Sequence, residues 1–250
     1  MTEEAAEEVE ASVVEVLVEE ALEENGNVGY VIRGNIMAKD TETIIKETLG
    51  ENLVVLAEYY TGDETNLLAI CNTLDFDELQ KLKKLKEIPF IFTKEELTDA
   101  VDVFPIEFLN IRQNHKIHYG DDILKDIEIS KENLRHQLEF EFRSKLIHLR
   151  RQYLQLKDRH LENLILSAVP TLVPMIGGLI YLKDLNYSDT QDMFKVVSEG
   201  YGIDVQVLKE IHDIRLGKAK LRKDKEHYIR ELIRVLTAIG EIVDHFKVTE

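Results

Sequence analysis

The spacing of apolar residues changes near Ser130 and divides the chain into two zones. Before it, short apolar runs such as 53–60 (LVVLAEYY) and 66–72 (NLLAICN) alternate with polar turns and short amphipathic stretches. Runs of this length bounded by turn residues are typical of strands. From Ser130 onward apolar residues recur every three or four positions, the spacing of helices. The pattern predicts an α+β fold, a small sheet domain followed by a helical bundle.

The first zone is expected to contain strands and short helices in alternation. We expect strands at 28–33, 53–60, 66–72 and 89–93, and helices at 41–49, 75–87 and 94–100. A hairpin of 115–120 with 126–130 is expected around Asp121 and Asp122. Gly50 is expected to end the first of these helices.

The second zone begins with the clearest helix of the chain. Ser130 is a suitable N-cap, because its hydroxyl can accept from a free backbone amide of the first turn. One apolar stripe follows at helical spacing, formed by Leu134, Leu138, Phe142, Leu146, Leu149, Tyr153 and Leu156. Further helices are expected at 160–182, 189–200, 204–215 and 222–246.

Residues 164–182 contain no charged side chain. A helix of this length is just long enough to cross a bilayer. Pro170, Pro174, Gly177 and Gly178 interrupt this run. A central helix of a bundle has the same composition, because it is packed on all sides. We therefore expect a buried helix, and a membrane-associated segment is the alternative.

The negative charge is concentrated at the N-terminus. Ten glutamates and no Lys or Arg occur in the first 25 residues, and removing those ten charges from the net −17 leaves −7. Val9, Val13, Leu17 and Ala21 recur at helical spacing, so residues 3–24 are expected to form a helix with an exposed acidic face. The expected organisation is an acidic helix at 1–26, an α+β domain at 27–129 and a helical bundle at 130–250.

Cys71 is the only cysteine, so no disulfide can form within the chain. The acidic N-terminus lacks the basic start of a signal peptide. Both features fit a reducing compartment, and we expect a cytoplasmic protein.

Several segments together resemble one enzyme superfamily. They are the Gly-containing turn between the first two strands, the strand 89–93 followed by a Thr-led helix, the run 102–112 (DVFPIEFLNIR), the sequence 118–122 (HYGDD) and the helix 134–154. In this order they resemble nucleotidyltransferases of the polymerase-beta-like fold that carry a C-terminal helical bundle, such as the aminoglycoside nucleotidyltransferases. The resemblance covers about residues 28–245 and implies a small mixed sheet.

The resemblance also implies an active site, and this chain departs from it. Active members are expected to bind nucleotide phosphates at a Gly-Ser turn and Mg²⁺ through two carboxylates, two residues apart on the next strand. Here the turn contains Gly62 followed by Asp63, and the aligned strand positions are Asn66 and Leu68. Gly62 is the one nucleotide-binding residue that the resemblance retains. We therefore expect a degenerate site without a metal or cofactor.

Asp75 and Asp77 offer a rival alignment, since they form their own Asp-x-Asp pair. They directly precede the helical pattern ELQKLKKLKE, where acids act as N-cap or first-turn residues. Capping is the preferred interpretation. In the alternative, Asp75, Asp77 and Asp63 would hold Mg²⁺ and a nucleoside triphosphate in an active enzyme.

Two further groups of residues are candidates for binding. His115 and His118 lie three apart in an expected strand, which places them on opposite faces and argues against a shared metal. The stretch 215–225 (RLGKAKLRKDK) is basic but has no aromatic residue of the kind that stacks on bases. A solvated connection between helices is the preferred interpretation, and nucleic acid is not an expected ligand.

These observations leave three hypotheses for function. The leading one is a nucleotidyltransferase-like protein that has lost catalysis and acts as a binding, assembly or regulatory module. Its partner would be another protein or a second copy that associates through the bundle. The alternatives are an active Mg-dependent nucleotidyltransferase that uses Asp75 and Asp77, and a regulator that binds nucleotides or nucleic acid through 215–225.

Overall fold

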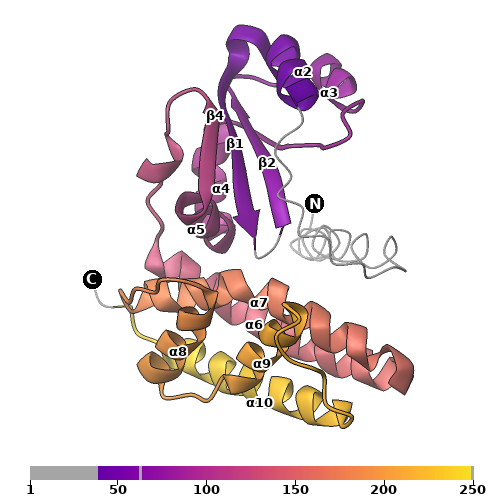
Figure 1. The fold of residues 1–250 in the computed structure, drawn as a ribbon. Helices are drawn as coiled ribbons and strands as arrows, with labels where there is room; N and C mark the ends of the chain where they lie inside the picture. Colours follow the sequence, from indigo (N-terminus) through magenta and orange to yellow (C-terminus); the bar gives the residue numbers. More distant parts are fainter. Residues whose placement is uncertain (1–38, 62–63, 249–250) are drawn as a thin grey trace, which may run out of the picture. The chain divides into compact units, whose positions relative to one another are not determined.

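A computed structural model describes residues 39–61 and 64–248 (Figure 1). The elements expected at 3–24 and 28–33 lie outside the described residues, as do Gly62 and Asp63. The remaining chain has the expected α+β architecture, a small sheet in the first part followed by a helical region.

The sheet has four strands in the order β3-β2-β1-β4. Strand β1 (Leu53–Thr61) lies in the middle and pairs antiparallel with β2 (Glu64–Cys71) and with β4 (His115–Tyr119). Strand β3 (Phe90–Thr93) runs parallel to β2, so the sheet is mixed.

The expected hairpin of 115–120 with 126–130 is wrong. Strand β4 pairs with the free edge of β1, and the chain after it forms a short 3-10 turn, η2 (Leu124–Asp126), followed by an irregular segment. Arg112 Nη1 donates to the carbonyl of Ile127 at 2.9 Å, which ties this segment to α5 instead. An alternating pattern predicts a strand but does not say which edge it will join.

The helices agree with expectation more closely. They are α2 (Lys39–Leu49), followed by the short η1 (Gly50–Asn52), α3 (Phe76–Leu82), α4 (Lys94–Val103), α5 (Pro105–Gln113), α6 (Lys131–Gln155), the short η3 (Asp158–His160), α7 (Leu161–Leu182), α8 (Thr190–Tyr201), α9 (Gln206–Arg215) and α10 (Lys225–His245). Helix α3 is shorter than expected, and α5 forms where no element was assigned. Ser130 is the N-cap of α6 as predicted, its hydroxyl accepting from the Asn133 amide at 3.3 Å.

The two faces of the sheet contribute to different cores, because alternate strand residues point to opposite sides. One face packs into a small cluster with α2 and α3 that includes Ile45, Leu56, Cys71 and Leu82. The other face joins the main core together with α5 and the bundle. The sheet and the bundle therefore share one hydrophobic core.

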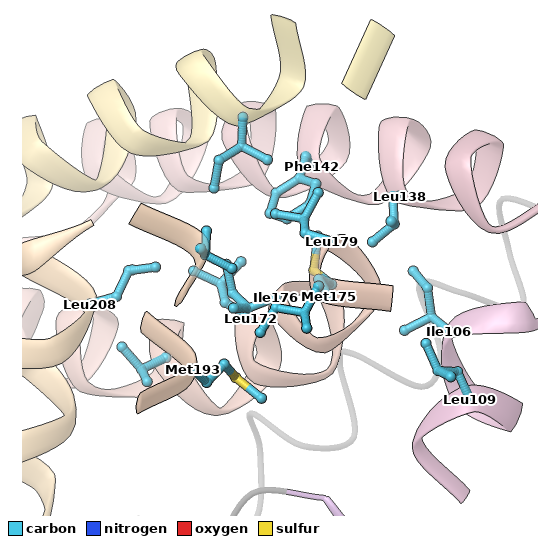
Figure 2. Close-up of a cluster of buried hydrophobic side chains, with 14 of the residues drawn as sticks. Ile106, Leu109, Leu138, Phe142, Leu172, Met175, Ile176, Leu179, Met193 and Leu208 are labelled. Atoms are coloured by element: carbon cyan, nitrogen blue, oxygen red, sulfur yellow. The ribbon is translucent and has the colours of Figure 1, made fainter. Parts of the chain in front are cut away.

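Helix α7 is the centre of the bundle (Figure 2). Its buried residues Leu172, Ile176 and Leu179 lie among side chains of α5, α6, α8 and α9, such as Phe142 and Leu208. Within the described part of the chain, one helical stretch, 158–182, is long enough and apolar enough to cross a membrane. Of its most apolar segment, 56% is buried inside the protein. This burial fits the expected core helix.

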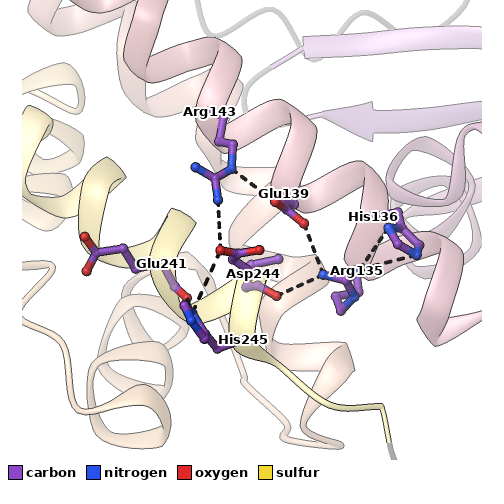
Figure 3. A network of polar contacts seen from close by, with 8 residues as sticks. Arg135, His136, Glu139, Arg143, Glu241, Asp244 and His245 are labelled. Atoms are coloured by element: carbon purple, nitrogen blue, oxygen red, sulfur yellow. Dashed lines mark hydrogen bonds and ion pairs between the residues drawn. The ribbon is translucent and has the colours of Figure 1, made fainter.

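Helix α6 is fixed to its neighbours in two ways. At Gly178 of α7 a side chain would meet Leu138 of α6 at about 3.1 Å, so the glycine lets the two helices approach closely. On another side Glu139 accepts from Arg135 and Arg143, each at 3.1 Å, and Arg143 pairs with Asp244 of α10 at 3.1 Å (Figure 3). These charges position α10 along α6.

Candidate functional site

The β1–β2 hairpin is where the resemblance placed the nucleotide site. Thr61 pairs with Glu64 at one end of the hairpin, and these residues bracket 62 and 63 in the sequence. Leu53 pairs with Cys71 at the other end. Eight residue steps of about 3.3 Å separate the two ends, roughly 26 Å.

The strand positions aligned with the metal ligands both lie on the face directed to the main core. Asn66 is opposite Tyr59, and Leu68 is opposite Ala57. Leu68 is completely buried in that core and Asn66 is half-buried. A carboxylate pair at these positions would place one charge among apolar side chains, where an unpaired charge is strongly disfavoured.

Asp75 is the N-cap of α3, as the sequence predicts. Its carboxylate accepts from the Glu78 amide at 2.7 Å, and the Glu78 carboxylate accepts from the Asp75 amide at 2.9 Å, a complete capping box. Asp77 follows as an exposed first-turn acid. Asn52 Oδ1 accepts from the Thr73 amide at 2.9 Å and so fixes this segment beside the start of β1.

Asp75 and Asp77 are therefore at the hairpin end that is remote from Thr61 and Glu64. The alternative active site needs them close to Asp63, which lies outside the described residues. Among the described residues, Asp75 and Asp77 are far from the ends of β1 and β2 that precede and follow Asp63 in the sequence.

Sequence reasoning missed the one buried acid among the described residues. Glu58 of β1 is 4% exposed, and its Oε2 lies 3.1 Å from Nε2 of His118 on β4. Tyr60 Oη lies 3.5 Å from the same Oε2. Burial and then the negative charge of Glu58 raise the pKa of the Tyr60 phenol, so its hydroxyl remains a donor at neutral pH. A single acid inside an otherwise apolar strand was the signal that could have identified this group.

A carboxylate beside an imidazole is an arrangement that can support proton transfer. Here the carboxylate is enclosed between two neighbouring strands, and the side chain of His118 is 15% exposed. The direct consequence of this geometry is structural. When His118 is protonated, the ion pair holds β4 against β1 and offsets the cost of the buried charge.

His115 points to the opposite face from His118, as predicted, and has its own partners. Its Nδ1 lies 2.9 Å from the carbonyl oxygen of Ile111, and its Nε2 lies 3.0 Å from Asp122 Oδ1. Burial opposes ionisation of Asp122, but the hydrogen bonds from His115 and from the Lys125 amide outweigh it and lower the pKa of this carboxyl. Asp122 thus accepts from the Lys125 amide of η2 and does not form the expected hairpin.

The described residues contain no group of three or more His, Cys, Asp and Glu side chains arranged to hold a metal ion. Two pairs of such side chains do occur, Glu58 with His118 and Asp122 with His115. Each pair could supply only two ligands, and the two histidines point to opposite faces of the sheet. Neither pair matches the set of several oxygen ligands that Mg²⁺ needs.

The basic stretch 215–225 connects α9 to α10, and most of it is exposed. Arg222 donates to Glu210 at 3.0 Å, and Lys225 pairs with Glu162 at 3.0 Å. Arg215 donates to the carbonyl of Leu166 at 2.8 Å. Three of its charged residues therefore hold the connection to the bundle, which agrees with the expected inter-helix role.

Comparison with known proteins does not identify the chain. No protein-family model matches it, and no curated protein is significantly similar to it in sequence.

Proposed function

We propose that the chain is a nucleotidyltransferase-like protein that has lost catalysis and acts as a binding or assembly module. The observation that carries the first half of this proposal is the burial of Leu68 in the main core. A magnesium ligand cannot replace this side chain without placing an unpaired charge in a tightly packed interior.

The geometry around Asp75 supports the same view. Asp75, one of the two acids that the alternative enzyme would use for metal binding, has a carboxylate oxygen engaged in a capping box with Glu78. The capping box satisfies free amides at the start of α3, so these acids have a structural reason to be present.

The second half of the proposal rests on exposed apolar side chains. Phe140, Ile147 and Leu154 of α6 are each more than half exposed, although α6 also contributes buried residues to the core. Large exposed apolar residues that lie together are typical of protein interaction sites.

Calorimetry with ATP or GTP in the presence of Mg²⁺, followed by an assay for transfer of labelled nucleotide, tests the loss of catalysis. We expect neither metal-dependent binding nor turnover. Turnover that disappears in an Asp75→Ala, Asp77→Ala variant, but persists in Asp75→Ser with its cap retained, would overturn the proposal. It would identify Asp77 as the essential acid. Loss in both variants would implicate Asp75 and overturn it equally.

A further inference from the structure

One face of α6 carries a line of apolar side chains directed away from the bundle core. Phe140, Ile147 and Leu154 are 58%, 63% and 82% exposed. They are seven residues apart, and a spacing of seven returns to nearly the same side of a helix. The core stripe of the same helix is formed by Leu134, Leu138, Phe142 and Leu149. Helix α6 thus has a second apolar face, which we call the outer stripe.

The outer stripe is flanked by positive charge. At about 100° per residue, Arg143, Arg150 and Arg151 lie within roughly 60° of Ile147. Arg143 pairs with Glu139 and Asp244 but is still 52% exposed (Figure 3). Arg150 and Arg151 are exposed and have no ion pair within the part of the chain that the structure describes. A ligand for this face therefore needs apolar side chains with negative charge beside them.

This charge excludes the simplest symmetric contact. If the outer stripes of two copies packed together, the arginines of each would approach cations of the other, and like charges across an interface are repulsive. An acidic amphipathic helix has the opposite property, since its carboxylates would meet Arg150 and Arg151.

The sequence of this chain predicts such a helix. Residues 3–24 carry ten glutamates and no Lys or Arg, with Val9, Val13, Leu17 and Ala21 at helical spacing. At 1.5 Å per residue the apolar positions 9–21 span about 18 Å, and the outer stripe spans about 21 Å. The two apolar stripes are therefore similar in length, and the glutamates of 3–24 are complementary to the arginines beside the outer stripe.

We propose that the outer stripe of α6 binds the acidic segment 3–24 of a second copy of the chain. This inference rests on the proposed function and specifies its partner. If each copy gives one acidic segment and receives one, the two contacts are related by twofold symmetry and the assembly closes as a dimer. The apolar side chains supply affinity, and the charges set orientation and specificity.

Sedimentation equilibrium of the full-length chain, at low and at high salt, tests the proposal. We expect a dimer at low salt that dissociates more readily at high salt, because screening weakens the contact between glutamates and arginines. Ile147→Glu with Leu154→Glu should weaken association at least about tenfold, since each change introduces a like charge at the contact. Phe76→Glu is the matched control, because Phe76 is 71% exposed on α3 and lies outside the outer stripe.

Charge reversal identifies the partner segment. Arg150→Glu with Arg151→Glu should weaken the dimer, and so should Glu20→Lys with Glu24→Lys, which fall on the same side of the predicted helix as Val13. The combination of all four changes should restore association, because opposite charges face each other again. No rescue, or a dimer that tolerates the changes in the outer stripe, would overturn the proposal.

A chain that is monomeric at all concentrations would overturn it as well. That result would leave the proposed loss of catalysis intact, because nucleotide transfer is measured independently. Conversely, nucleotide turnover by a dimer would refute the proposed function while the contact through α6 stood.

Discussion

Cys71 shows how burial controls chemistry at the level of one residue. Its side chain is completely buried in β2, and Sγ lies 3.5 Å from the Phe92 carbonyl oxygen. Burial first, and then the charges of Glu78 and Glu96, raise the pKa of the thiol to about 11. Since the thiolate is the reactive form, the native protein should be inert to thiol reagents.

We expect Cys71 to remain unmodified by a disulfide reagent at pH 8 in the folded protein and to react fully in urea. Absorbance of the released thiolate measures the reaction. The labelling rate then reports how often the sheet opens. Rapid stoichiometric labelling without denaturant would contradict the buried placement of Cys71.

Asp122 gives a prediction about pH. Its pKa is lower in the folded protein than in the unfolded chain, so its ionised form stabilises the fold. This contribution is present above the unfolded pKa of about 3.9 and is lost as pH falls toward the folded value. Asp122→Asn should therefore be less stable than wild type at pH 6, and the difference should shrink progressively as pH falls below about 4. Urea unfolding across this range measures it, with Asp121→Asn as the control. A difference that is constant with pH would contradict the role of the charge.

At the scale of the element, the start of helix α3 depends on one N-cap residue, Asp75. Asp75→Ala removes the acceptor for the Glu78 amide and should lower the free energy of unfolding by about 1 kcal/mol. Asp75→Ser is the control, because a serine hydroxyl can also accept from that amide. Chemical denaturation measures both variants. Equal losses in the two would mean that the cap is not the cause.

The turn after β4 depends on Gly120. Its φ is +82°, and an added Cβ would collide with the carbonyl of Val54 in β1. Gly120→Ala should cost at least about 2 kcal/mol, because strain and a backbone clash add together. Gly217 has φ +70° with no atom within 4 Å of an added Cβ, so Gly217→Ala isolates the strain alone. The control should lose about 1 kcal/mol in urea unfolding. Similar losses at both sites would show that the close approach to Val54 is unimportant.

These elements also show what sequence can predict. Ser130 and Thr93 were readable as helix starts, because capping depends on residues within one turn. The pairing of β4 with β1 was not readable, since the partner lies more than fifty residues earlier in the chain. The ion pair of Glu58 with His118 depends on that pairing and was missed for the same reason. The cap at Asp75 was local and was predicted.

The shared core is the property of the molecule as a whole. Residues from the sheet, such as Val55 and Ile70, belong to the same buried cluster as Ile176 of α7 and Leu236 of α10. The proposed assembly through α6 therefore acts on a helix whose core stripe is part of that cluster. A contact at the outer stripe should stabilise the sheet as well as the bundle, because ligands that bind only the folded state stabilise all that unfolds with it.

The division expected from the sequence, at 129 and 130, would allow the sheet and the bundle to unfold separately. A common core predicts one cooperative transition. Far-UV circular dichroism follows the helices, and Cys71 labelling follows the sheet, so both should give the same urea midpoint. Leu109 of α5 is 1% exposed in this core. Leu109→Ala should lower the free energy of unfolding by about 2–5 kcal/mol and shift both urea midpoints downward together. Two separate midpoints, or a shift in only one probe, would show that the sheet and the bundle are independent folding units despite their shared core.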